Sequence, residues 1–186
     1  MSQTGDITFA LWQLVLRTFH IMQRARQREL NHFGITLRAS AVLSTIMRLG
    51  DKATISNIAN QLVLEEHSVS AQLTRMEKDG LIEKSKDKGK SKLIQVIITE
   101  KGYDFFTQGM ERKATDSIMS VLTEEEKISL WTILAKLRKQ SMIELGRDDQ
   151  DLYPPSNIGE LPELNKQEGM MENILLNRST FNKAIS

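Results

Sequence analysis

The sequence predicts a mainly α-helical protein that carries one small β-hairpin. Apolar residues recur at spacings of three and four over most of residues 7–146, which is the period of an amphipathic helix. Between residues 81 and 99, two short segments of strand-forming residues instead flank a polar, lysine-rich stretch, the pattern of two strands and their turn. All three prolines follow residue 150, so none interrupts the predicted helices.

Two helices are predicted at the start of the chain. The first carries an apolar stripe over residues 7–22, with Thr4 or Asp6 as its candidate N-cap. It is expected to end within residues 31–34, because Gly34 can adopt a positive φ. A second helix is expected from about Thr36 until Gly50 and Asp51 break it.

The middle of the chain predicts two further short helices and then the hairpin. Residues 53–55 read as a very short strand, and Ser56 is a good N-cap for a helix that runs to about Leu62. After a turn over residues 63–66, a helix is expected over residues 67–78. Its inward side chains are expected to be Val69, Leu73 and Met76. The hairpin strands are expected over residues 81–85 and 93–99.

Two longer helices are predicted after the hairpin. Thr99 is expected to cap a single helix whose apolar face continues to Val121. Thr123 and the three glutamates after it form a capping box that opens the last helix, which Gly146 ends. The remaining residues, 147–186, are acidic and contain the prolines, so they predict a linker or partly disordered tail with one short helix around residues 167–177.

Composition excludes several classes of protein. The chain has no cysteine, which removes disulfides, thiolate nucleophiles and cysteine-based zinc sites. The three histidines, His20, His32 and His67, lack the spacing of adjacent metal ligands, so neither a metal nor a cofactor is expected. No glycine-rich phosphate loop or catalytic dyad is evident, so an enzyme is not expected. No apolar run could span a membrane and no signal peptide is evident, so a cytoplasmic location is expected.

The order of two short helices, a third helix and a two-stranded hairpin is that of a winged helix-turn-helix. In this fold the third helix buries one side on its scaffold and offers the other to the major groove of double-stranded DNA. The outward side chains of the expected recognition helix are small, polar or basic, which suits close approach to base edges and phosphates. They are Ser68, Ser70, Ala71, Thr74, Arg75 and Lys78. On these residues alone, an ordinary solvated helix face is an equally good reading.

The lysines of the hairpin favour contact with DNA. From Lys84 onward they alternate with other residues, and in an extended strand this period places side chains on one face. The wing residues expected to reach phosphates or the minor groove are Lys86, Lys88, Lys90 and Lys92. The other reading is that the lysines protect an exposed strand edge from pairing. Beside a recognition helix, DNA contact is the better interpretation.

Four stretches, in this order and spacing, resemble the MarR family of bacterial regulators, named for multiple antibiotic resistance. They are residues 55–62 (ISNIANQL), 68–70 (SVS), 76–82 (MEKDGLI) and 98–102 (ITEKG), and the resemblance extends over about residues 7–145. The family's wing usually carries an Asp-Arg pair, where this chain has Lys90-Ser91-Lys92. The resemblance therefore implies a DNA-binding wing without its usual arginine.

The resemblance implies a homodimer built from residues 1–34 and 100–146, with a winged helix-turn-helix DNA-binding domain at residues 35–99 and a tail at residues 147–186. It implies a transcriptional regulator, expected to be a repressor that occupies a pseudo-palindromic promoter site. It also implies a small aromatic or anionic effector. Candidate pocket residues are Trp12, Phe19, His20 and Arg24, although two aromatic residues at helical spacing are more often core.

A winged-helix module that binds protein without specific DNA binding is the alternative function. The surface beside the recognition helix distinguishes the two readings. DNA binding is favoured if Arg75 and the lysines form one basic surface, whereas the interaction module is favoured if nearby acidic side chains dominate it. Those acids are Glu65, Glu66, Glu77 and Asp79.

Overall fold

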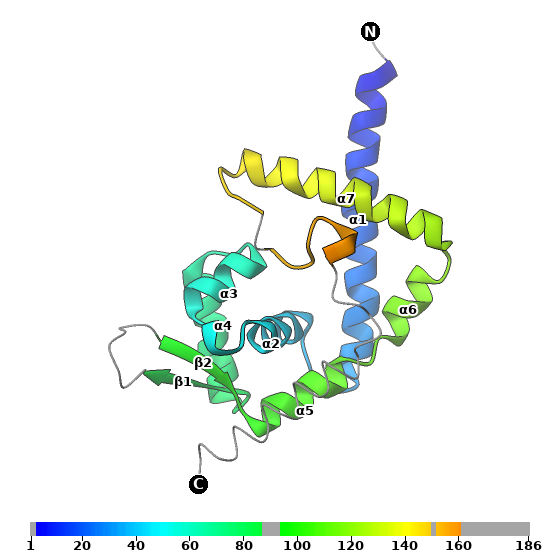
Figure 1. The fold of residues 1–186 in the computed structure, drawn as a ribbon. Coiled ribbons are helices and arrows are strands. Elements are labelled where there is room, and N and C mark those ends of the chain that lie inside the picture. Colours follow the sequence, from blue (N-terminus) through cyan, green and yellow to red (C-terminus); the bar gives the residue numbers. More distant parts are fainter. Residues whose placement is uncertain (1–2, 87–93, 150–151, 161–186) are drawn as a thin grey trace. The chain divides into compact units, whose positions relative to one another are not determined.

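The computed structural model describes residues 3–86, 94–149 and 152–160 (Figure 1). The chain divides into two compact units, Met1–Thr123 and Glu124–Ser186. The described residues of the first unit contain six α-helices and a two-stranded antiparallel sheet, and those of the second contain one long helix and a short 3₁₀ turn. This confirms the predicted fold class, mainly helical with one small hairpin.

The first two helices lie where the sequence predicts them. Helix α1 (Gln3–Asn31) begins before both candidate caps, so neither Thr4 nor Asp6 is its N-cap. Helix α2 (Leu37–Leu49) begins after Thr36, whose hydroxyl oxygen accepts a hydrogen bond from the Ala39 amide at 3.1 Å. The extent predicted for this helix is therefore confirmed, and the structure adds Thr36 as its N-cap.

Helices α3 (Ile55–Leu62) and α4 (Glu66–Lys78) follow, with one correction to the prediction. The N-cap of α3 is Thr54 and not Ser56, because the Thr54 hydroxyl accepts from the Asn57 amide at 3.2 Å. The expected strand at residues 53–55 is reduced to one bridge between Thr54 and Gln95. Since Thr54 is extended and paired across to the hairpin, the helix begins one residue later, before Ser56 can cap it.

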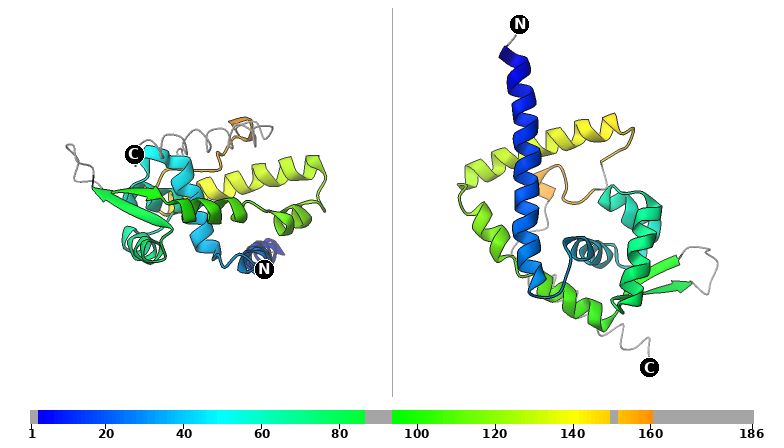
Figure 2. Two further views of the ribbon diagram at one scale, coloured as in Figure 1. Left: turned by 90° about the horizontal axis from the view of Figure 1, so that it is seen from below. Right: turned by 180° about the vertical axis from the view of Figure 1, so that it is seen from behind.

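The hairpin consists of β1 (Ile82–Lys86) and β2 (Ile94–Ile98), which confirms the two predicted strands. Its register pairs Ile82 with Ile98 and Lys84 with Val96. Because directly paired residues share one face of a hairpin, the Lys84 side chain is on the same face as the buried Val96. Figure 2 shows the hairpin projecting beyond α4.

The region after the hairpin corrects the prediction of one continuous helix. The structure has α5 (Glu100–Gly109) and α6 (Lys113–Met119), with a break between them. Arg26 of α1 donates to the carbonyl oxygens of Gly109 and Glu111 at this break. Those carbonyls are thus satisfied without a continuous helix, and apolar periodicity within the segment carries no sign of this contact.

Helix α2 lies between the α3–α4 pair and α5 in the first unit (Figure 1). Val69, Leu73 and Met76 of α4 are at most 1% exposed. This confirms the prediction that they are the inward side chains of this helix. Other fully buried side chains come from α1, α2, α3 and the hairpin. They are Leu30, Val42, Leu43, Ile58, Ile82 and Val96. The core therefore holds α4 and the hairpin on one common scaffold.

The second unit is built on α7 (Glu124–Glu144). The described residues after Gly146 include the 3₁₀ turn η2 (Ile158–Glu160), which contacts this helix. Arg138 of α7 donates to the Pro154 carbonyl oxygen at 2.5 Å and to the Ser156 hydroxyl at 2.7 Å. The Trp131 indole N–H donates to the Ser156 carbonyl oxygen at 3.1 Å. The start of the predicted tail is therefore attached to α7, while the helix predicted around residues 167–177 lies outside the described residues.

Candidate nucleic-acid interface

The outward face of α4 carries all six predicted recognition residues. Ala71, Thr74, Arg75 and Lys78 are exposed, while Ser68 and Ser70 are half-buried. This difference follows from the helical period, because the two serines flank the buried stripe and the other four lie opposite it. The side of α4 opposite its buried stripe thus carries two cations, Arg75 and Lys78, beside small side chains.

Of the predicted wing lysines, only the backbone of Lys86 belongs to the described residues, as the last residue of β1. Lys88, Lys90 and Lys92 lie outside them. The register pairs Lys86 with Ile94, so its position is on the same face of the hairpin as Lys84. The expected contacts of these four lysines with DNA stay a prediction.

Lys84 forms a polar clasp between the hairpin and α4, and we use this name for Lys84, Thr74 and Glu77 together. Its Nζ lies 2.9 Å from Thr74 Oγ1 and 3.1 Å from Glu77 Oε2. Its backbone N–H also donates to Glu77 Oε1 at 3.2 Å. The Lys84 side chain is only 18% exposed, although its sequence context suggested one more lysine of a solvated wing.

The clasp changes the balance of charge beside α4. Of the four acidic residues that would favour the interaction-module reading, Glu77 is paired with a lysine at close range. Glu65, Glu66 and Asp79 are exposed. Glu65 and Glu66 are at the N-terminal end of α4, where the helix dipole favours an acid. The centre of the exposed α4 face is therefore basic and polar, and not acidic.

The four candidate pocket residues, Trp12, Phe19, His20 and Arg24, are all exposed on α1. Trp12 is 59% exposed and Phe19 is 58% exposed, so neither is a core side chain in this chain. Their expected role in binding an effector stays a prediction. The part of the chain that the structure describes contains no group of three or more acidic or histidine side chains placed to hold a metal ion.

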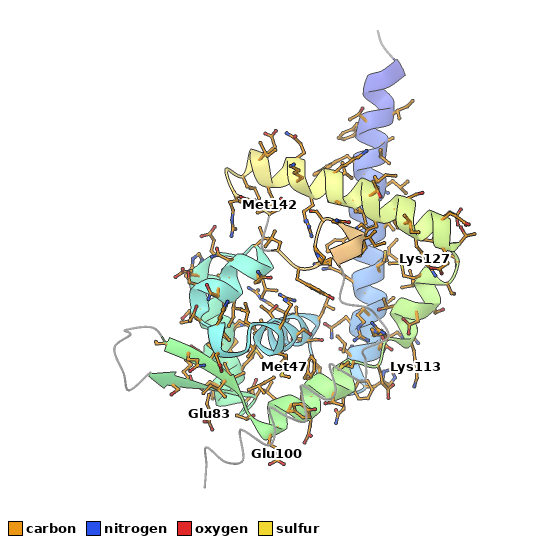
Figure 3. All side chains as sticks on the ribbon, viewed as in Figure 1. Met47, Glu83, Glu100, Lys113, Lys127 and Met142 are labelled. Carbon is orange, nitrogen blue, oxygen red and sulfur yellow. The ribbon has the colours of Figure 1, made fainter. Side chains whose placement is uncertain are left out.

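A separate open pocket of about 620 Å³ lies between the end of α1 and the start of α6. Its lining includes Phe33, Arg28 and His32 from the α1 side and Lys113, labelled in Figure 3, at the start of α6. Glu29 also lines it. Partial burial raises the pKa of Glu29, but hydrogen bonds from Arg26 and Ala114 and the charge of Arg26 outweigh burial and hold that pKa below its usual value. Glu29 is thus an ionised anchor between α1 and α6.

Sequence reasoning missed the clasp and the Arg26–Glu29 anchor. Glu77 and Lys84 are on different elements, so no helical or strand period relates them. Arg26 reaches residues 83 and 85 positions further along the chain. For the clasp the signal is a charge of opposite sign on another element, and for Arg26 it is a pair of backbone carbonyls far along the chain. A single sequence identifies neither partner.

Helices α2, α3 and α4, with the exposed face of α4 and the projecting hairpin, define a winged helix-turn-helix protein. The family model described as "MarR family" matches residues 33–91. In addition, the chain is 33% identical to the organohalide-sensing transcriptional regulator RdhR-CbdbA1625, solved with bound 2,4-dichlorophenol, over 85% of this chain and 96% of that one, with a TM-score of 0.73. The chain belongs to the MarR family, and it is a transcriptional regulator and not an enzyme.

Two further relatives are similar to this chain. The HTH-type transcriptional regulator PecS of Dickeya dadantii (strain 3937) is 24% identical over 123 residues, which are 64% of this chain and 74% of PecS. The S. aureus MepR–DNA complex gives a TM-score of 0.64 at 22% identity and covers 69% of this chain and 96% of the MepR chain. The MepR likeness concerns the fold alone.

Proposed function

We propose that this protein is a homodimeric, sequence-specific DNA-binding repressor that occupies a pseudo-palindromic promoter site. Residues 35–99 would form the DNA-binding domain, and residues 1–34 and 100–146 the dimerisation helices. The observation that carries the proposal is the exposed face of α4, where Arg75 and Lys78 stand among small polar side chains over a fully buried apolar stripe. Such a helix can enter a major groove without losing its own packing.

The proposed roles of the α4 residues follow from their chemistry. Arg75 can donate two hydrogen bonds to guanine or bind a phosphate, and Lys78 suits a phosphate. Ser68, Ser70 and Ala71 are small enough to let the helix backbone approach the bases. The wing lysines 86, 88, 90 and 92 would add contacts with the sugar-phosphate backbone that do not depend on sequence.

The exposed apolar surface of α1 supports the homodimer. Large hydrophobic side chains with more than half of their surface exposed occur between residues 7 and 21 of this helix. They are Ile7, Phe9, Leu11, Trp12, Leu14, Phe19 and Ile21. Soluble proteins rarely leave so continuous an apolar surface uncovered. A second copy would bury it, and a twofold axis would place two α4 helices on half-sites about one DNA turn, ~34 Å, apart.

We also propose a small aromatic effector that releases the DNA. RdhR-CbdbA1625 is described as organohalide sensing and was solved with 2,4-dichlorophenol. In this chain Trp12, Phe19, His20 and Arg24 are exposed on α1, so a site built from them would need the second copy to enclose it. His20 and Arg24 would supply hydrogen-bond donors for a phenolate or another anion.

The proposed effector is tested with 2,4-dichlorophenol itself. Adding it should raise the dissociation constant for the specific DNA site by about fivefold or more, the lower end of ordinary coupling between two ligands. Calorimetric titration of the protein without DNA measures the binding, and cyclohexanol is the control for non-specific apolar contact. Heat of binding with no change in DNA affinity would exclude this phenol as a releasing effector.

The alternative, a winged-helix module that binds protein and not DNA, has support only from Glu65, Glu66 and Asp79. These acids lie at the two ends of α4, whereas Arg75 and Thr74 are nearer its middle. Glu77, the fourth acid, is paired with Lys84. The distribution of charge on α4 therefore favours DNA binding over the protein-interaction module.

The central test is Arg75→Ala on DNA fragments selected from the source genome by the wild-type protein. If Arg75 reads a base, the variant should lose about 1–3 kcal/mol on the selected site, which is roughly 5- to 150-fold in affinity. Binding to random duplex should fall much less. Fluorescence anisotropy with both duplexes, at a fixed salt concentration, measures the difference.

Arg112→Ala serves as the matched control, because it removes an exposed arginine at the N-cap of α6. It should leave both affinities unchanged. Equal losses on the selected and random duplexes for Arg75→Ala would assign Arg75 to a phosphate. A wild-type protein that retains no fragment at low ionic strength would contradict the proposed function as a whole.

A further inference from the structure

We propose that Lys84 is a positioning residue that determines how Thr74 and Glu77 of α4 face DNA. The inference rests on the proposed DNA-binding function. It departs from the expectation that Lys84 is one more cation of the wing, because its ammonium group is directed at α4 and not into solvent.

Both the backbone N–H and the ammonium group of Lys84 contact α4. The backbone N–H binds one carboxylate oxygen of Glu77 at 3.2 Å, and Nζ binds the other at 3.1 Å. Nζ also donates to Thr74 Oγ1 at 2.9 Å. The side chain is 18% exposed, so little of it is available to a phosphate. Glu83, the next residue along β1 and labelled in Figure 3, is by contrast exposed.

The clasp restricts what the Thr74 hydroxyl can recognise. A hydroxyl has one hydrogen and two lone pairs. Thr74 donates its hydrogen to the Ser70 carbonyl oxygen at 2.9 Å, and it accepts from Lys84. Phosphate oxygens only accept hydrogen bonds, so Thr74 held in this way offers them nothing. It presents a methyl group and one lone pair, which suit a thymine methyl or a base amino group in the major groove.

The clasp also cancels a charge that would oppose binding. Glu77 is 40% exposed on the helix that would enter the groove, and a free carboxylate there would repel the phosphates. Lys84 supplies the matching positive charge within 3.1 Å. Loss of Lys84 would therefore release both the carboxylate and the Thr74 hydroxyl, so its effect on DNA binding would pass largely through Glu77.

A double-mutant cycle separates this role from simple phosphate contact. Lys84→Met should weaken binding to the selected site by about tenfold or more, as expected when a close charge partner is left alone. Glu77→Gln alone should stay within about threefold of wild type, and Lys84→Met with Glu77→Gln should return to that range, because paired residues are not additive. The double variant should also keep the wild-type dependence on salt, since it removes one charge of each sign.

Lys78→Met is the matched comparison, because Lys78 is an exposed cation on the same helix. Its loss should not be repaired by Glu77→Gln, and its salt slope should fall by about one, as for a phosphate contact. If Lys84→Met behaves in the same way, Lys84 is a phosphate contact and the inference is wrong. Thr74→Val should leave binding to random duplex within about twofold of wild type if Thr74 makes no phosphate contact. A larger loss would overturn the assignment of its hydroxyl.

Thermal unfolding of each variant tests whether it is folded at the temperature of the binding assay. Should Lys84→Met not fold at the assay temperature, Lys84→Gln carries the same cycle, because it keeps one donor for Thr74 and still removes the charge. Lys84→Arg should retain binding within about threefold. A wild-type protein that binds no duplex would contradict the proposed function, whereas wild-type binding with an unrepaired Lys84 variant would contradict this inference alone.

Discussion

Replacing Leu11 and Leu14 together by glutamate should leave the protein monomeric and reduce its affinity for the selected DNA site by about 100-fold or more, because the two half-sites are then no longer bound as one unit. The two side chains are three residues apart on α1 and are 55% and 61% exposed in the single chain. In the proposed homodimer they would be buried, and an unpaired carboxylate is costly to bury. Sedimentation velocity measures the oligomeric state, and anisotropy measures DNA binding.

Arg17→Glu is the control for this experiment. Arg17 is on the same helix and is already charged and exposed, and its replacement by glutamate changes the net charge by the same two units. It should remain dimeric and bind the site with little change. A Leu11 and Leu14 variant that stays dimeric at micromolar concentration would mean that the two copies do not meet through this face of α1.

Gly102→Ala should lower the free energy of unfolding strongly, because the backbone of Leu81 leaves no room for a Cβ atom. A Cβ atom at Gly102 would lie 1.9 Å from the Leu81 carbonyl oxygen and 2.9 Å from the Leu81 carbonyl carbon. Both are backbone atoms, and the Leu81 oxygen already accepts from the Thr99 amide at 3.1 Å. The start of α5 or the start of the hairpin must therefore move, at a cost of about 3 kcal/mol or more.

Gly109→Ala is the matched control, in the same helix. There the nearest atom to an added Cβ is the Ser40 hydroxyl oxygen at 3.4 Å, an ordinary contact. Its free energy of unfolding should stay within about 1 kcal/mol of wild type. Urea unfolding followed by circular dichroism measures both variants. Equal stability of the two would contradict the close approach of α5 to Leu81.

Tertiary structure also explains part of the motif by which the chain resembles its family. The stretch ITEKG contains Thr99, whose hydroxyl accepts from the Gly102 amide at 3.0 Å and donates to the Gly80 carbonyl oxygen at 2.7 Å. It also contains Gly102, which lies against the Leu81 backbone. The motif therefore connects the entry of the hairpin to the start of α5, and it fixes the wing relative to the following helix.

The amino-acid sequence by itself determined the class of fold, the hairpin and the side of α4 that is buried. These features depend on local periodicity, because Val69, Leu73 and Met76 recur at helical spacing and the segments around the lysines alternate as strands do. The outward residues of α4 followed from the same period. The MarR-family assignment followed from short stretches whose order and spacing are visible in one chain.

Only the tertiary structure decided which elements contact one another and through which residues. It divided the helix predicted up to residue 121 at the carbonyls that Arg26 binds, and it moved the cap of α3 to Thr54, which is paired with Gln95. It also turned Lys84 from a member of a lysine run into the partner of Thr74 and Glu77. Each of these depends on a hydrogen bond or ion pair between elements that are separate in sequence, and no period within one element encodes such a contact.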